Sequence, residues 1–185
     1  MATKKTHFIY SMAYVSMCIA LLCVSAWISI PFPVSFTLQL FAVFFIAAVS
    51  GWKHSLLSIT LYLLLGLLGV PVFSGFQAGP SVFFHGTGGY LIGFVISSLI
   101  ISLAICWLGS SRTTLGLSML GSLLVCYTCG TGWYLLLYHG TDRSVSLVSA
   151  LAVCVLPFII PDLLKIMLAV ILARKLGPYL QRIKP

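Results

Sequence analysis

The amino-acid sequence predicts an all-α integral membrane protein in which six helices cross the bilayer and all 185 residues form a single transmembrane domain. Hydrophobic residues make up 61% of the chain and charged residues only 6%, whereas about 25% of residues are charged in soluble domains. The mean hydropathy is +1.16. The apolar residues gather in runs that approach the roughly 20 residues of a membrane-crossing helix. These observations exclude a soluble enzyme and leave no room for a nucleotide-hydrolysing domain.

Turn-forming residues divide the apolar sequence into the expected spans. Pro31 closes the first span, Gly51 follows the second and Pro71 stops the third, because proline and glycine interrupt helices. Two lysines followed by the first apolar run resemble a secretory signal peptide. The run is longer than the apolar core of about 7 to 15 residues in such signals, so we expect it to stay in the protein as a membrane helix. The expected spans are about 8–30, 36–50, 55–70, 88–108, 115–138 and 161–179.

The last apolar region, residues 145–176, is too long for one straight crossing. As a single helix it would measure roughly 48 Å, against a hydrocarbon core of about 30 Å. Pro157 and Pro161 mark the expected break, since proline cannot donate to the helical ladder and disfavours helix just before it. We therefore expect a short helix at the membrane interface over about 144–156, followed by the sixth span.

The distribution of basic residues predicts the orientation. Six spans place both termini on one side, and cytoplasmic loops are enriched in Lys and Arg. Arg143 is the one basic residue expected on the opposite side, and Lys165 lies within a helix. Eight basic residues fall on the side of the termini, which we predict to be cytoplasmic: Lys4, Lys5, Lys53, Arg112, Arg174, Lys175, Arg182 and Lys184.

Two charged residues lie inside an expected span, where charges are costly and usually functional. Asp162 and Lys165 are three residues apart and share one face of a helix. Asp162 also lies near the helix start, where backbone amides favour a negative charge. The pair is either a neutralising ion pair, with a lysine that snorkels to the interface, or a polar ligand site. The absence of any other acid in a span favours the ligand site.

The loop before the fourth span offers a second candidate. Non-helical backbone at membrane depth must be buried or line a cavity, and Gln77, Thr87 and Tyr90 can hydrogen-bond a small molecule. The alternative is an ordinary outer loop, with Gly89 and Gly93 serving helix packing. Together with Asp162 and Lys165, the loop suggests a pocket open to the outside.

Other kinds of site find little support. The basic residues are dispersed between apolar runs, which favours membrane topology over nucleic-acid binding. The four histidines are scattered, and Cys126 and Cys129 have no second pair to complete a zinc site, so packing is the favoured role of the six cysteines. No GxxxxGK[ST] motif is present. We expect no catalytic residues, no metal site and no direct use of ATP.

At residues 30–39 the run IPFPVSFTLQ resembles the P-x-P-V-P-F-T-x-Q opening of the BioY proteins, the biotin-binding S components of energy-coupling-factor (ECF) transporters. The resemblance continues in order through YLLLGLLGVPVF at 62–73, GTGGYLIGF at 86–94 and the D-x-x-K motif at 162–165. There are two departures. Ser35 replaces a proline of the opening motif, and HGTGGY at 85–90 stands where the family usually has G-P-T-G-G-Y.

The resemblance implies a six-helix ECF S component, not an enzyme, that binds biotin with high affinity and takes it up across the bacterial cytoplasmic membrane. Asp162 and Lys165 would then contact biotin, with a carboxylate able to accept from the ureido ring and an ammonium able to pair with the valerate carboxylate. Which residue meets which end stays open. Gln77, Thr87 and Tyr90 would close the pocket, and Gln39 ends the opening motif. No cofactor is expected.

The resemblance also implies partners, namely a membrane coupling subunit and two ATPases. In the family, small residues on the first helix form the contact, and here they correspond to Ala13, Ser16 and Ala20. Packing within the chain is the alternative role of these residues. Two other functions stay open: an S component for another vitamin, and an integral membrane enzyme that uses Asp162.

Overall fold

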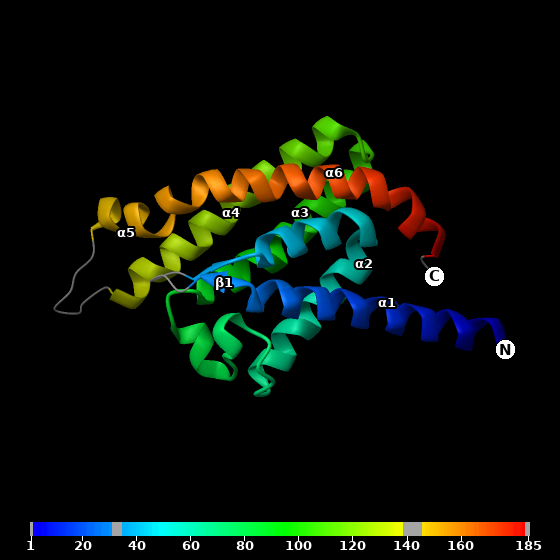
Figure 1. The fold of residues 1–185 in the computed structure, drawn as a ribbon, viewed down its shortest axis with the longest axis horizontal. Helices are drawn as coiled ribbons and strands as arrows, with labels where there is room; N and C mark the ends of the chain where they lie inside the picture. The colour runs from blue at the N-terminus through cyan, green and yellow to red at the C-terminus, as the bar shows by residue number, and fades with distance from the viewer. Residues whose placement is uncertain (1, 31–34, 139–145, 184–185) are drawn as a thin grey trace.

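The computed structural model describes residues 2–30, 35–138 and 146–183 (Figure 1). Five stretches are long and apolar enough to cross a membrane: Thr6–Trp27, Gln39–Leu67, Gly88–Leu108, Arg112–Tyr138 and Leu147–Leu180. The protein is therefore an all-helical, multi-pass membrane protein. Its α-helices are α1 (Ala2–Trp27), α2 (Gln39–Leu67), α3 (Gly88–Leu108), α4 (Arg112–Tyr138), α5 (Leu147–Cys154) and α6 (Ile159–Ile183).

Helix α2 folds back on itself at Gly51. This residue has φ 69° and ψ 164°, which lie outside the helical region and are readily adopted only by glycine. Gln39 at the start of α2 donates a 2.7 Å hydrogen bond from Nε2 to Tyr62 Oη, although an unbroken helix would separate the two residues by roughly 34 Å. The arms 39–50 and 52–67 therefore run back alongside each other (Figure 1), over the sequence where we expected the second and third spans.

A two-stranded ribbon precedes α2 and corrects its expected start. Strand β1 (Ser29–Ile30) pairs antiparallel with β2 (Phe36–Thr37), with Ile30 opposite Phe36. Helix α2 consequently begins at Gln39 and not at residue 36. Ile, Phe and Thr favour extended structure, and hydropathy alone does not separate a short buried strand from the start of a helix.

The last apolar region is broken near its prolines. Helix α5 ends at Cys154, Val155 adopts the non-helical angles φ −125° and ψ −55°, and the 3₁₀ turn η3 (Leu156–Phe158) contains Pro157. Helix α6 then begins at Ile159, with Pro161 tolerated in its first turn because the amides there have no helical acceptor. Both termini lie at the same end of the molecule, and α5 lies at the opposite end (Figure 1).

Some residues of the expected topology lie outside the described ranges. They are Pro31, Arg143, residues 144–145 of the expected interfacial helix, and Lys184.

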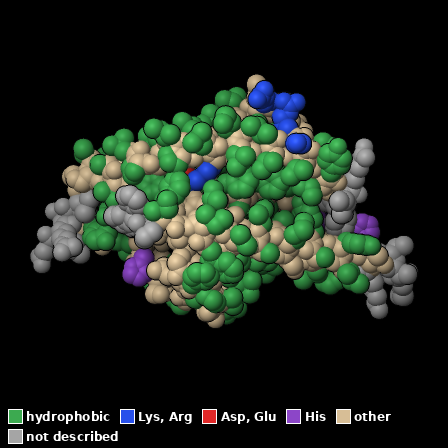
Figure 2. All heavy atoms as spheres, in the orientation of Figure 1, with side chains coloured by type: hydrophobic (Ala, Val, Ile, Leu, Met, Phe, Trp, Pro, Cys, Tyr) green, Lys and Arg blue, Asp and Glu red, His purple; other side chains and the backbone are tan. Residues whose placement is uncertain are grey.

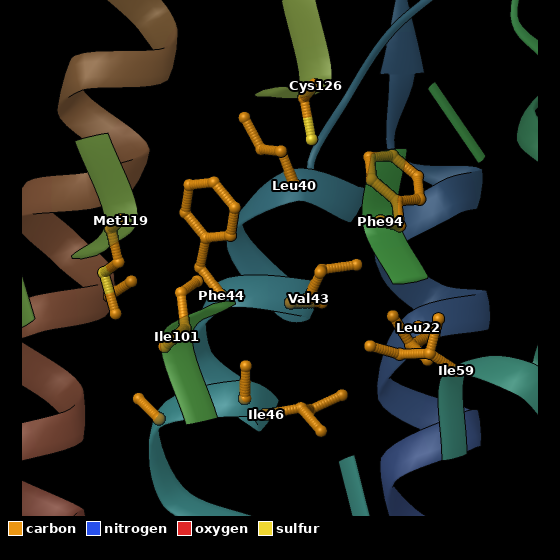
Figure 3. Close-up of a cluster of buried hydrophobic side chains, with 14 of the residues drawn as sticks. Leu22, Leu40, Val43, Phe44, Ile46, Ile59, Phe94, Ile101, Met119 and Cys126 are labelled. Atoms are coloured by element: carbon orange, nitrogen blue, oxygen red, sulfur yellow. The ribbon is translucent and has the colours of Figure 1, made fainter. Parts of the chain in front are cut away.

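The hydrophobic core lies where α1, both arms of α2, α3 and α4 meet (Figure 3). Leu22, Phe44, Ile59, Ile101 and Met119 are each at most 1% exposed and contribute one side chain from each of these segments. Close contact of α3 with α4 depends on glycine. A Cβ atom on Gly89 would lie 2.3 Å from the Cys129 carbonyl oxygen, and one on Gly93 would lie 3.1 Å from Cys126 Cα.

Candidate ligand-binding site

A buried ion pair lies in the first turns of α6. Lys165 Nζ lies 2.7 Å from Asp162 Oδ1, and the two residues are 6% and 4% exposed. Positions i and i+3 share one helix face, and the start of a helix favours the carboxylate. Burial of two charged side chains costs more desolvation free energy than burial of an equivalent apolar pair, so a buried ion pair is weak evidence of a stabilising role. Charged residues inside a membrane-spanning helix are usually functional, and this pair therefore points to a functional site.

Two aromatic residues that sequence reasoning missed hold this pair. Tyr127 of α4 donates a 2.9 Å hydrogen bond to Asp162 Oδ2, so each carboxylate oxygen has its own donor. Lys165 Nζ also lies 4.0 Å from the centroid of the Phe36 ring, within range of a cation–π interaction. Phe36 in turn stacks on Phe158, with 5.9 Å between ring centroids. The ammonium is thus held between a carboxylate and an aromatic face.

A cavity opens beside the ion pair and brings the six sequence-predicted binding residues together. Asp162, Lys165, Tyr90, Gln77, Thr87 and Gln39 all line it. The amide of Gln39 is buried, whereas Gln77 is exposed at the loop. Further lining residues come from β2, α2, α3, α4 and the segments between them: Ser35, Thr37, Leu40, Phe73, Ser74, Val82, Leu91, Phe94, Cys126, Tyr127 and Phe158.

Hydrogen bonds fix the polar residues on the α2 side of this cavity. Thr37 Oγ1 donates to Gln39 Oε1 at 3.2 Å, and Gln39 Nε2 donates to Tyr62 Oη at 2.7 Å. Tyr62 Oη donates onward to the carbonyl of Val72 at 3.0 Å. This chain of contacts joins the start of α2 to the segment that follows α2. The sequence did not indicate Tyr62, because the fold-back at Gly51 brings it to Gln39.

The segment between α2 and α3 covers one side of the cavity. It contains the 3₁₀ turns η1 (Ser74–Phe76) and η2 (Pro80–Phe84). Phe73 packs directly against Gly66, where a Cβ atom would lie 2.2 Å from the Phe73 ring. Trp27 Nε1 donates to the Pro71 carbonyl at 3.1 Å, and its ring stacks on Phe76. Contacts with α1 and α2 therefore hold this cover in place.

The chemistry of the cavity suits a small, partly polar molecule. One carboxylate, one ammonium, two amides and several hydroxyl groups converge, and aromatic and aliphatic side chains form the remaining walls. Among the described residues, no group of three or more His, Cys, Asp or Glu could hold a metal ion. Fold and site together define a multi-pass membrane protein with an internal cavity lined by a charged pair and other polar groups.

Comparison with known proteins gives the family. The BioY family model matches residues 1–182, and the chain belongs to the BioY family. It is 38% identical to the biotin transporter BioY of Thermotoga maritima over 85% of this chain and 89% of that protein. It is 40% identical to a probable biotin transporter BioY of Pyrococcus horikoshii, over 88% and 93% of the two chains. A solved S-component for biotin from an ECF-type ABC transporter has the same fold, with a TM-score of 0.83, 22% identity and 92% of each chain covered.

Proposed function

We propose that this protein captures biotin in the cavity beside Asp162 and Lys165 and acts as the S component of an ECF transporter. The observation that carries the proposal is a buried ion pair that lines a cavity in a chain of the BioY family. The function is transport and not catalysis, in keeping with the relatives named biotin transporters. This leaves no role for Asp162 as a catalytic acid.

The short distance within the ion pair favours one binding arrangement. The ureido ring and the carboxylate lie at opposite ends of biotin, whereas Lys165 Nζ and Asp162 Oδ1 are only 2.7 Å apart. An extended ligand cannot bring its two ends to these two atoms while the pair stays intact, and a ligand carboxylate beside Asp162 would be repelled. The ureido ring instead has N–H donors next to a carbonyl acceptor, so one ring can donate to Asp162 and accept from Lys165.

Both groups have the capacity for these extra bonds. A carboxylate offers about four acceptor positions, and Tyr127 and Lys165 use two at Asp162. An ammonium has three donors, of which one is given to Asp162. The apolar walls, including Phe73, Phe94 and Phe158, would then enclose the thioether ring and alkyl chain. Gln77, Thr87 and Tyr90 would close the outer side.

The decisive experiment is a calorimetric titration of biotin into the detergent-purified chain, with riboflavin and thiamine as competing vitamins. We expect saturable one-to-one binding of biotin and no heat from the other two vitamins. Binding of riboflavin or thiamine without biotin would assign the cavity to another vitamin. Absence of binding by all three would reject the proposed function.

We place both termini in the cytoplasm and count six crossings, with each arm of α2 as one of them. The two termini lie at the same end of the molecule (Figure 1), which an even number of crossings requires, and the excess of basic residues there supports the orientation. In the bacterial cytoplasmic membrane, the cavity would then open outward. Alkaline phosphatase fused to the C-terminus is expected to be inactive and green fluorescent protein at the same place to be fluorescent. The opposite pair of results would invert the topology.

The exposed small residues of α1 support a partner contact. Ala13, Ser16 and Ala20 share one face of α1 and are exposed, so they do not serve packing within the described chain. We assign this face to a coupling subunit that carries two ATPases. Ser16→Trp is expected to abolish most co-purification with that subunit, while biotin binding by the isolated chain is unchanged. Leu124→Trp, at an exposed position of α4 and therefore off this face of α1, is the control, and an equal loss in both variants would contradict the assignment.

A further inference from the structure

A second hollow lies along α6, about three turns beyond Lys165. This α6 groove has a volume of about 240 Å³ and is formed by α6, the end of the first arm of α2 and the α3–α4 turn. Small residues create it, because Ala48 and Ala173 contribute only methyl groups and a Cβ atom on Gly177 would meet no atom within 4 Å. Arg174 and Ser110 supply its polar lining, and Leu115 supplies an apolar wall.

The arginine of this groove has no protein counter-charge among the described residues. The chain carries ten Lys and Arg residues against two Asp and Glu residues. Asp162, the one acid in the described ranges, is bonded to Lys165 and Tyr127. Figure 2 shows Lys and Arg side chains gathered at the upper edge of the view, in the region of the α3–α4 turn, apart from the charged pair near the middle of the face. Within the described ranges, no carboxylate is therefore left to pair with Arg174, and the groove can accept an anion from outside.

We propose that the α6 groove binds the phosphate headgroup of an anionic phospholipid. The planar guanidinium of Arg174 can bond two phosphate oxygens at once, and the Ser110 hydroxyl can donate a further bond. Ile171, one turn before Arg174, is 46% exposed and offers apolar surface to an acyl chain. Basic pockets between membrane helices on the cytoplasmic side are typical sites for anionic headgroups. The leaflet follows from the orientation proposed above, whereas the contact chemistry does not depend on it.

The test uses the full chain in a neutral detergent and measures the rise in Tm as phosphatidylglycerol is added, with phosphatidylcholine and inorganic phosphate in parallel. We expect a saturable rise with phosphatidylglycerol alone. Arg174→Gln is expected to weaken this binding about five-fold, the effect of one basic residue at an anionic surface. Lys175→Gln is the control, because it removes the same charge from the next residue, which is exposed and lies outside the groove. It is expected to bind phosphatidylglycerol nearly as tightly as the original chain does.

A third variant tests the shape of the groove and not its charge. Gly177→Leu adds a bulky side chain at a lining residue where a Cβ atom would meet no atom within 4 Å, and it is expected to weaken phosphatidylglycerol binding with the net charge unchanged. Biotin titration of each variant reports folding and is independent of the lipid result. Equal losses in Arg174→Gln and Lys175→Gln would overturn the proposal in favour of general charge attraction. Saturation by inorganic phosphate alone would overturn it in favour of a free-anion site.

Discussion

Asp162→Asn is expected to weaken biotin binding by about 10- to 150-fold, because a hydrogen bond to a charged group contributes about 1.5 to 3 kcal/mol. The amide side chain would keep the shape of the carboxylate but could no longer offset the ammonium of Lys165, which is 6% exposed. Calorimetric titration measures the loss. Tyr127 and Phe36 contact the pair from other elements, so the variant should still fold, with a lowered Tm. Unchanged affinity would make Asp162 a structural residue.

The companion variant Lys165→Met shows which end of biotin meets the pair. In biotin amide the valerate carboxylate is neutralised, but the ureido ring is kept. We therefore expect Lys165→Met to weaken the binding of biotin and of biotin amide by the same factor. If Lys165 instead paired with the valerate carboxylate, the amide would already bind weakly and Lys165→Met would cost it little more. The interaction energy between the ligand change and the residue change separates the two cases: it is near zero if Lys165 meets the ureido ring, and large if Lys165 meets the carboxylate. Lys53→Met is the control, because Lys53 is exposed and does not line the cavity.

The buried ion pair was predictable from sequence because its rarity and spacing indicated it. Charged residues are scarce in this chain, and only Asp162 and Lys165 stand together in an apolar run at helical spacing. Pro157 and Pro161 likewise indicated the break before α6, since their effect on the backbone is local.

The partners of the pair depend on tertiary contacts and left no comparable signal. Tyr127 stands 35 positions before Asp162 in the sequence and reaches it only because α4 packs against α6. Tyr62 meets Gln39 only through the fold-back at Gly51. Phe36 belongs to the opening motif, but its place over Lys165 depends on pairing of β2 with β1. Composition and periodicity report which face is apolar, and they do not report which distant side chain meets it.

The cavity wall formed by Tyr90 depends on the missing side chain of Gly130. A Cβ atom at Gly130 would lie 2.3 Å from the Tyr90 ring, so the ring would have to move. The Tyr90 hydroxyl donates a 2.7 Å hydrogen bond to the carbonyl of Cys154, which opposes that movement. Helices α3, α4 and α5 are thereby joined at the edge of the cavity.

Gly130→Ala is therefore expected to lower the free energy of unfolding by about 1 to 3 kcal/mol, the usual cost of overpacking, and to weaken biotin binding through displacement of Tyr90. Thermal unfolding and calorimetric titration measure the two effects. Gly132→Ala is the matched control on the same helix, because a Cβ atom there meets nothing within 4 Å and alanine is the better helix former by about 1 kcal/mol. It should keep full affinity and an equal or higher Tm. Indistinguishable behaviour of the two variants would show that close contact at Gly130 does not shape the cavity.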